Sequence, residues 1–137
     1  MTDTVNRDNG YHGGRYVNLI VDPERGALLK KIATDLASIT LDDRQLCDFE
    51  LLTTGAFSPL TGFMNRSNYE SVLDRNKLQD GTLWPVPICL DVSETAARPL
   101  EAGQSVVVRD PEGFLLAVMH VEDIWKPDKE KEATLLY

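Results

Sequence analysis

The spacing of hydrophobic residues predicts a helix near the start of the chain. Asp22 and Pro23 stand where an N-cap and a first helical residue are favoured. The apolar residues that follow at helical spacing are Leu28, Leu29, Ile32, Ala33 and Leu36. We therefore expect a helix over residues 22–36, with these side chains on one face.

A second helix is predicted over residues 40–55. Thr40 and Asp43 come close to the capping-box pattern, in which two side chains bond free backbone N–H groups at a helix start. Gly55 is placed to end the helix in the left-handed conformation. Its apolar stripe is Leu46, Phe49 and Leu52. A third, short helix is expected over residues 65–76, with three inward side chains, Tyr69, Val72 and Leu73.

The stretch GAFSPLTGFM, residues 55–64, joins the second and third predicted helices. Ser58-Pro59 suits the start of a turn, and Gly62 allows a second positive φ. The apolar side chains are Phe57, Leu60, Phe63 and Met64. Burying each contributes about 1.5–3 kcal/mol. We interpret the stretch as a packed corner that fixes the angle between two helices; the alternative is a contact with a partner domain.

Strand patterns occur at the start and in the second half of the chain. Residues 16–21 are rich in β-branched and aromatic side chains and predict a short strand. Pro85 and Pro87 limit residues 82–92 to an edge strand or an extended approach to one. Residues 105–125 predict a hairpin whose turn is DPEG. Helices thus mostly precede strands, which favours an α+β fold with a small, partly closed sheet.

Composition fits a folded chain of one-domain size. The 137 residues are 42% hydrophobic and 26% charged. Residues 1–14 are polar, with Gly13-Gly14, and we expect a flexible lead-in followed by one domain over residues 15–137. No apolar run reaches the length of a membrane span, and the N-terminus has no apolar signal region. We expect a cytoplasmic protein without a membrane partner.

The net charge of −8 disfavours nucleic acid as a partner, because such binding needs Lys and Arg on phosphates. Lys30-Lys31 is the only adjacent basic pair. Cys47 and Cys89 are 42 residues apart, which fits neither a metal site nor a disulfide framework. We expect two buried, reduced thiols.

Catalytic constellations are scarce in the sequence. His12 lies in the lead-in, and His120 is interpreted as a half-buried, hydrogen-bonded residue of a strand rather than a general base. The carboxylate pairs are Asp42-Asp43 and Glu122-Asp123. The first suits a helix N-terminus and the second a solvated strand end. The glycines match neither a P-loop nor a dinucleotide fingerprint.

Three blocks of the sequence resemble one enzyme family. They are HGGRYVNL from His12, DRQLCDFELLTTGAFSPLTGFMNRSNYESVL from Asp43, and LQDGTLWPVPICLDV from Leu78. Together with the closing VEDIWKPDKEKEATLLY, they are similar to the N-terminal domain of ATP sulfurylase (sulfate adenylyltransferase). Tyr11 stands where many members of that family have Pro.

The resemblance implies a PUA-like fold, a mixed β pseudobarrel with helices packed on it. The family enzyme transfers the adenylyl group of ATP to sulfate, and its site lies in a following α/β domain with Gln-x-Arg-Asn and His-x-x-His motifs. Neither motif occurs here: Leu73 stands where the pair Arg75-Asn76 would need Gln, and the two histidines, His12 and His120, are 108 residues apart. No catalytic, cofactor-binding or metal-binding residue is therefore assigned, and no cofactor is expected in this chain; ATP and sulfate would be substrates of the whole enzyme.

Two functions follow as hypotheses. The first is a non-catalytic N-terminal domain of a sulfate adenylyltransferase, whose partners are the following catalytic domain and further copies in a homo-oligomer. The ending Leu-Leu-Tyr favours a chain that continues past Tyr137. The alternative is a free-standing PUA-like module that binds RNA or a protein, for which a basic groove with exposed aromatic residues would be the signal. An independent enzyme within these residues has the least support.

Overall fold

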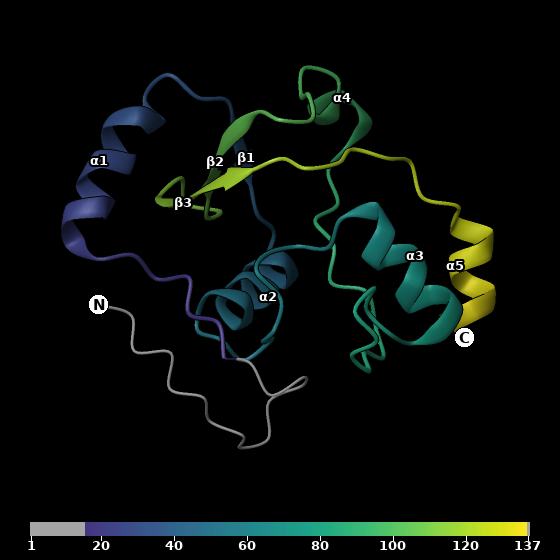
Figure 1. Ribbon diagram of the computed structural model, residues 1–137. Helices are drawn as coiled ribbons and strands as arrows, with labels where there is room; N and C mark the ends of the chain where they lie inside the picture. The colour runs from purple at the N-terminus through teal and green to yellow at the C-terminus, as the bar shows by residue number, and fades with distance from the viewer. Residues whose placement is uncertain (1–15, 137) are drawn as a thin grey trace. The chain divides into compact units, whose positions relative to one another are not determined.

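The computed structural model describes residues 16–136, so the lead-in predicted over residues 1–14 lies outside the described part (Figure 1). Within it the elements are α1 (Pro23–Ala33), β1 (Ser38–Thr40), α2 (Asp43–Thr53), α3 (Arg66–Arg75), α4 (Glu94–Ala97), β2 (Ser105–Arg109), β3 (Leu115–His120) and α5 (Lys129–Leu136). Helices combined with a mixed sheet confirm the predicted α+β class.

The described chain forms two compact units, each built from separate segments of sequence. Unit 1 contains residues 16–19, 49–90 and 125–136. Unit 2 contains residues 20–48 and 91–124. Helix α2 contributes its first half to unit 2 and its second half to unit 1.

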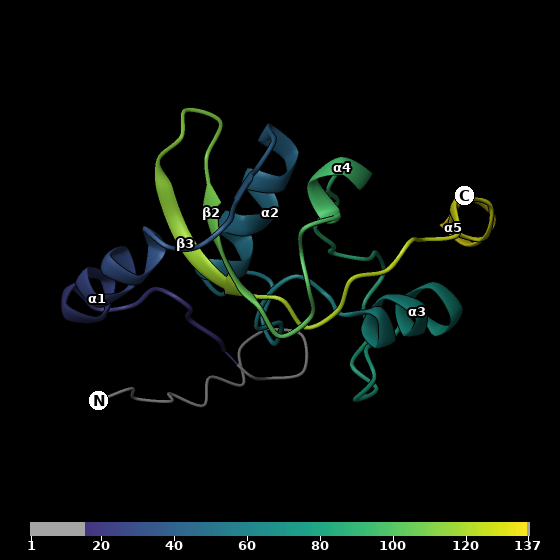
Figure 2. The ribbon, with the colours of Figure 1, turned by 90° about the horizontal axis from the view of Figure 1, so that it is seen from above.

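Unit 2 holds the three-stranded sheet, in the order β1-β2-β3. β1 pairs with β2 in parallel, with Ser38 opposite Val107, and β2 pairs with β3 antiparallel, with Val107 opposite Val118. The middle of β2, Val106 to Val108, is buried, as expected for a central strand with neighbours on both sides. The hairpin of β2 and β3 confirms the sequence prediction (Figure 2).

The turn of this hairpin follows from its residues. The Asp110 carboxylate accepts the backbone N–H groups of Glu112 and Phe114, at 3.0 and 2.9 Å. Gly113 has φ +94°, a conformation that glycine adopts without strain. The DPEG sequence therefore forms the turn through a side-chain acceptor and a glycine, and the strand register shifts between Val108 and Arg109.

Helix α1 begins as predicted, but its apolar face is only partly covered. The Asp22 side chain accepts the N–H of Arg25 at 2.7 Å, and Pro23 occupies the first turn. Ala33 is buried, whereas Leu28 and Ile32 expose about half of their surfaces. α1 contacts β3 within unit 2.

Unit 1 is centred on one hydrophobic cluster, made of Leu52, Leu60, Met64, Val72, Leu78, Trp84 and Ile88. Helix α3 supplies Val72 to this cluster and also buries Tyr69 and Leu73, as predicted. Asn65 caps the start of α3, and Asn76 ends it in the left-handed conformation with φ 52°. The apolar spacing therefore predicted the correct inward face of this helix.

The strand predicted over residues 16–21 is wrong, and of the two forms predicted for residues 82–92 the edge strand is not found. Residues 16–21 and 82–92 form no strand, although Leu83 makes an isolated bridge with Lys77. The backbone N–H groups of Val17 and Leu19 donate to Ser58 and Thr53 instead of to a strand, and Pro85 and Pro87 have no N–H for a ladder. Three short elements, β1, α4 and α5, were not predicted, since β1 and α4 have only three and four residues and α5 has no buried face.

Candidate functional site

The corner at residues 55–64 is a packed turn, as the sequence predicted. Leu60 and Met64 are buried in the core of unit 1, and Phe57 and Phe63 pack against that core. The Phe57 ring meets the Trp84 ring edge-on, with centroids 5.8 Å apart, which is a favoured aromatic geometry.

The glycines of the corner differ from each other. Gly55 has φ +90°, which confirms its predicted left-handed conformation at the end of α2. Gly62 does not have a positive φ, so that prediction is wrong. The chain turns at Ser58-Pro59 instead, and no left-handed residue is needed at Gly62.

Residues 16–19 lie directly on this corner. The Val17 N–H donates to the Ser58 hydroxyl at 2.8 Å, and that hydroxyl donates to the Gly55 carbonyl at 2.6 Å. Further along, the Leu19 N–H donates to the Thr53 carbonyl at 3.1 Å. Ser58 is fully buried, so these bonds satisfy a hydroxyl that would otherwise lose its solvation.

The close approach of this segment requires glycine at position 55. A Cβ built there would lie 2.4 Å from Cε2 of Tyr16 and 2.6 Å from the carbonyl oxygen of Val17. The second contact is with backbone, which cannot swing away as a side chain can. Residues larger than glycine are therefore excluded at position 55 for two reasons. The positive φ is strained for them, and their Cβ would clash with Tyr16 and Val17.

The capping box at the start of α2 lies two residues later than the sequence predicted. The capping box is formed by Asp42 and Gln45 rather than by Thr40 and Asp43. The Asp42 carboxylate accepts the Gln45 N–H at 2.8 Å, and Gln45 Oε1 accepts the Asp42 N–H at 2.9 Å. The three-residue spacing from Asp42 to Gln45 in DDRQ was the signal that could have identified it.

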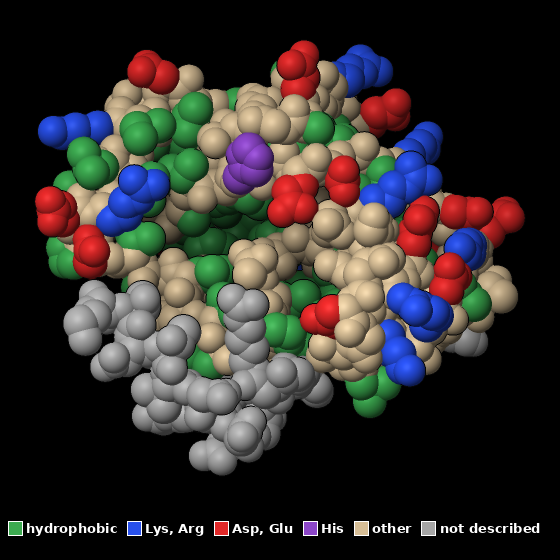
Figure 3. Space-filling model, in the orientation of Figure 1, with side chains coloured by type: hydrophobic (Ala, Val, Ile, Leu, Met, Phe, Trp, Pro, Cys, Tyr) green, Lys and Arg blue, Asp and Glu red, His purple; other side chains and the backbone are tan. Residues whose placement is uncertain are grey.

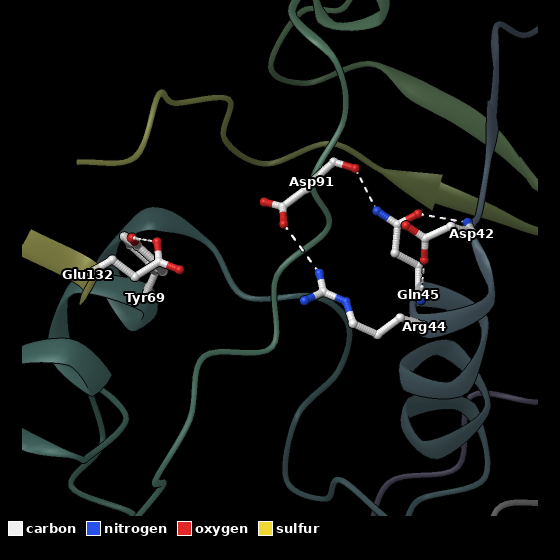
Figure 4. Close-up of polar contacts among 6 residues, drawn as sticks. All are labelled: Asp42, Arg44, Gln45, Tyr69, Asp91 and Glu132. Carbon is white, nitrogen blue, oxygen red and sulfur yellow. Dashed lines mark hydrogen bonds and ion pairs between the residues drawn. The ribbon is translucent and has the colours of Figure 1, made fainter. Parts of the chain in front are cut away.

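Gln45 also ties α2 to a distant part of unit 2. Its Nε2 donates to the Asp91 carbonyl at 2.6 Å, and the Gln45 side chain is buried (Figure 4). Arg44 reaches the Asp91 carboxylate at 3.4 Å, but this ion pair is exposed. The buried amide therefore contributes more to stability than the ion pair, because exposed pairs are screened by water.

Two carboxyl groups have shifted pKa values. Burial raises the pKa of Asp48, opposed by the Arg44 charge and assisted by the Asp42 charge. Hydrogen bonds from Thr82, the hydroxyl first and then the backbone N–H, lower the pKa of Asp80. The Thr82 N–H lies 2.9 Å from Asp80 Oδ1. Both causes are local and structural, so neither shift by itself indicates a catalytic group.

In unit 1, helix α5 is fastened to α3 by side chains. The Tyr69 hydroxyl donates to the Glu132 carboxylate at 2.7 Å (Figure 4). Lys131 pairs with Asp74 at 3.1 Å. The Trp125 ring, just before α5, lies 5.5 Å from the Tyr69 ring. Sequence reasoning missed this arrangement, because Tyr69 and Glu132 are 63 residues apart.

The remaining candidate residues that lie within residues 16–136 are not brought together. His12 lies outside the described residues, and His120 is exposed rather than half-buried, because it ends β3, which has one neighbouring strand in the three-stranded sheet. Cys47 is exposed, which corrects the prediction of a buried thiol; it lies about 200° around α2 from the buried Gln45. Cys89 is partly buried.

The carboxylate pairs lie where the sequence placed them. Asp42 and Asp43 stand at the N-terminus of α2, and Glu122 and Asp123 are exposed just after β3. In residues 16–136, no three His, Cys, Asp or Glu side chains gather as a metal site would require. The same residues include no helix long and apolar enough to cross a membrane.

Comparison with known proteins connects this arrangement to a family. Residues 9–137 match the model of the PUA-like domain. The chain is 41% identical over 129 residues to the sulfate adenylyltransferase of Kluyveromyces lactis, and 44% identical over 133 residues to that of Emericella nidulans. These matches cover 92% and 94% of this chain, but only 26% and 23% of the relatives. The chain thus spans about a quarter of the length of these relatives.

A solved structure, that of a hexameric APS kinase from Thiobacillus denitrificans, shares the fold. It is 44% identical in sequence and superposes with a TM-score of 0.78. The match covers 88% of this chain and 24% of that one, so in this relative too the fold is one part of a larger polypeptide. The chain belongs to the PUA-like domain family, in the form found as the N-terminal domain of sulfate adenylyltransferases.

Proposed function

We propose that this chain works as a non-catalytic part of a sulfate adenylyltransferase. That enzyme joins sulfate to the α-phosphorus of ATP while the bond to pyrophosphate breaks, giving adenosine 5′-phosphosulfate and pyrophosphate. The observation that carries the proposal is 41–44% identity to enzymes of that name over more than nine-tenths of this chain. The chain covers only a quarter of those enzymes, so we assign the reaction to the whole polypeptide.

The supporting role follows from how the polar side chains are used. Ser58 and Gln45 are buried and bonded to backbone groups, and Tyr69 is bonded to Glu132. Each of these groups forms hydrogen bonds that hold segments of the domain together. Its hydrogen-bonding capacity therefore serves the fold rather than the binding of a substrate. We propose that the domain presents a firm surface to the catalytic part of the enzyme.

We further propose a cytoplasmic homo-oligomer that acts in sulfate assimilation. Oligomerisation is supported by the solved relative from Thiobacillus denitrificans, which is a hexamer. The cytoplasm is supported by the free, exposed thiol of Cys47, which a reducing compartment preserves. The net charge of −8 speaks against nucleic acid as a partner of this domain.

The proposed function can be tested with a chimera. The matching quarter of the Emericella nidulans enzyme would be replaced by this chain, and sulfate-dependent release of pyrophosphate from ATP would be measured. We expect the chimera to be active and the 137-residue chain alone to be inactive. A folded chimera without activity, or turnover by the purified chain alone, would contradict the proposal.

A further inference from the structure

Unit 1 carries a surface stretch without charge. Residues 81–90, GTLWPVPICL, contain no Asp, Glu, Lys or Arg, whereas 26% of the whole chain is charged. Asp80 and Asp91 bound the stretch on either side. Depletion of charged residues is a mark of the centre of protein–protein interfaces.

Part of this stretch is strongly exposed. Leu83 exposes 64% of its surface and Val86 exposes 52%, and Pro85 between them is also exposed. We call Leu83, Pro85 and Val86 the apolar knob. In Figure 3, hydrophobic side chains project at the lower edge of the view, where Figure 1 places the loop that follows α3.

The apolar knob is anchored by the buried side chain of Trp84 and by a backbone bridge of Leu83. Trp84, within the knob's sequence, is only 3% exposed and belongs to the core of unit 1. Its N–H donates to the Asn76 carbonyl at 2.8 Å, and its ring contacts Phe57. Leu83 bridges to Lys77 in an antiparallel pair. A surface that is already fixed loses little conformational entropy when it binds.

We propose that the apolar knob docks into an apolar surface of the rest of the sulfate adenylyltransferase polypeptide. This inference rests on the proposed function and names the surface through which the domain meets its neighbour. The relatives carry about three-quarters of their length outside the region that this chain matches, so such a neighbour is present in each of them.

Other occupants fit less well. A nucleic acid would need a cluster of basic side chains near the knob, whereas residues 76–91 contain a single one, Lys77, the bridge partner of Leu83. A symmetric contact between two copies places the same patch on both sides, and two projecting knobs do not complement each other in shape. The knob instead requires a concave, apolar partner surface.

The proposal is tested by side-chain footprinting with a carbene label. Labelling of Leu83 and Val86 would be compared between the isolated chain and the chimera with the Emericella nidulans enzyme. We expect labelling in the chimera to fall about fivefold, because interface centres exclude solvent. Phe114, which is 65% exposed in unit 2, serves as the reference and should label equally in both proteins.

Three results would overturn the proposal. Equal labelling of the knob in both proteins would show that the rest of the enzyme does not cover it. A knob already protected in the isolated, monomeric chain would show that this chain covers it. Protection in the isolated chain that grows with protein concentration, together with a dimer in sedimentation, would assign it to a second copy.

A pair of variants separates docking from folding. The double variant Leu83→Ser, Val86→Ser should leave the urea midpoint of the isolated chain unchanged, since both side chains face solvent there. In the chimera it should lower the melting temperature by at least about 2 °C, whereas Phe114→Ser should not. Equal effects of the double variant and Phe114→Ser in the chimera would contradict docking. Sulfate-dependent activity of the same chimera tests the proposed function separately.

Discussion

At the scale of single residues, Gly55 is the position that the fold tolerates least. It combines φ +90° with a close approach of Tyr16 and the Val17 carbonyl. We predict that Gly55→Ala lowers the free energy of unfolding by about 2–4 kcal/mol, from left-handed strain and overpacking together. Urea denaturation followed by fluorescence measures this change.

Gly81 provides the matched control for Gly55. It has the same φ of +90°, but an added Cβ would meet nothing within 4 Å. Gly81→Ala should therefore cost only the strain, about 1–2 kcal/mol. Equal losses in the two variants would show that the packing of residues 16–19 on the corner contributes nothing to stability.

Asp48 and Asp80 should give opposite dependences of stability on pH. The pKa of Asp48 is raised in the folded protein, mainly by burial, so its ionised form opposes folding once the pH exceeds the ordinary carboxyl value. The pKa of Asp80 is lowered, mainly by the Thr82 hydroxyl, so its ionised form favours folding above that value. Stability from Asp80 is lost as the pH falls through its lowered pKa.

We therefore predict that Asp48→Asn is more stable than the parent at pH 7 and that Asp80→Asn is less stable. Each difference should stay below about 0.5 kcal/mol, because both groups are largely solvated. Both differences should shrink as the pH falls below about 4, where the unfolded carboxyls are protonated. Urea midpoints between pH 3 and 7 test this, and changes of the same sign in both variants would disprove it.

At the scale of secondary-structure elements, Gln45 joins the start of α2 to residue 91. We predict that Gln45→Ala lowers the free energy of unfolding by about 2 kcal/mol, because it removes a cap and leaves the Asp91 carbonyl without its donor. Gln45→Glu keeps the oxygen that caps Asp42 but turns a buried carboxylate oxygen toward the Asp91 carbonyl, so it should lose at least as much. Arg44→Ala removes only an exposed ion pair and should cost under about 0.5 kcal/mol. Equal losses in Gln45→Ala and Arg44→Ala, measured by urea denaturation, would contradict this ranking.

Helix α5 depends on tertiary contacts, because its eight residues bury no side chain fully. We predict that Tyr69→Phe, which removes the 2.7 Å bond to Glu132, costs about 1 kcal/mol and speeds hydrogen exchange of the α5 amides. Lys131→Ala, at a half-exposed pair with Asp74, should change exchange much less. Unchanged α5 exchange in Tyr69→Phe would mean that another contact holds this helix.

The elements also show what the sequence could predict. Helices α1, α2 and α3 and the β2–β3 hairpin were correct because apolar spacing and turn residues are local signals, although the capping box of α2 was predicted two residues too early. β1 was missed because its three residues acquire strand conformation only by pairing with β2. Residues 16–21 were wrongly predicted as a strand because their hydrogen bonds go to the end of α2 and to Ser58, over 30 residues away.

The candidate site was less predictable than the fold. The packed corner was correct from composition alone, whereas the Gln45–Asp91 and Tyr69–Glu132 contacts join residues 46 and 63 positions apart. No local pattern marks such pairs. The family was predicted from blocks such as GAFSPLTGFM, and the comparisons confirm it.

At the scale of the whole molecule, the central claim is that these 137 residues act as one domain of a larger enzyme. The relatives are about four times as long as the region they share with this chain. A domain of this kind needs a firm core and an outward surface for its neighbour, and unit 1 provides both through its core cluster and the apolar knob.

The most direct test is the mass of the native polypeptide that contains this sequence, measured in a cell extract by immunoblot with an antibody raised against the 137-residue chain. We predict a band several times heavier than 15.3 kDa, with sulfate-dependent pyrophosphate release in the same purified fraction. A single native species of 15.3 kDa would contradict the central claim, because the chain would then act without the catalytic part of a sulfate adenylyltransferase.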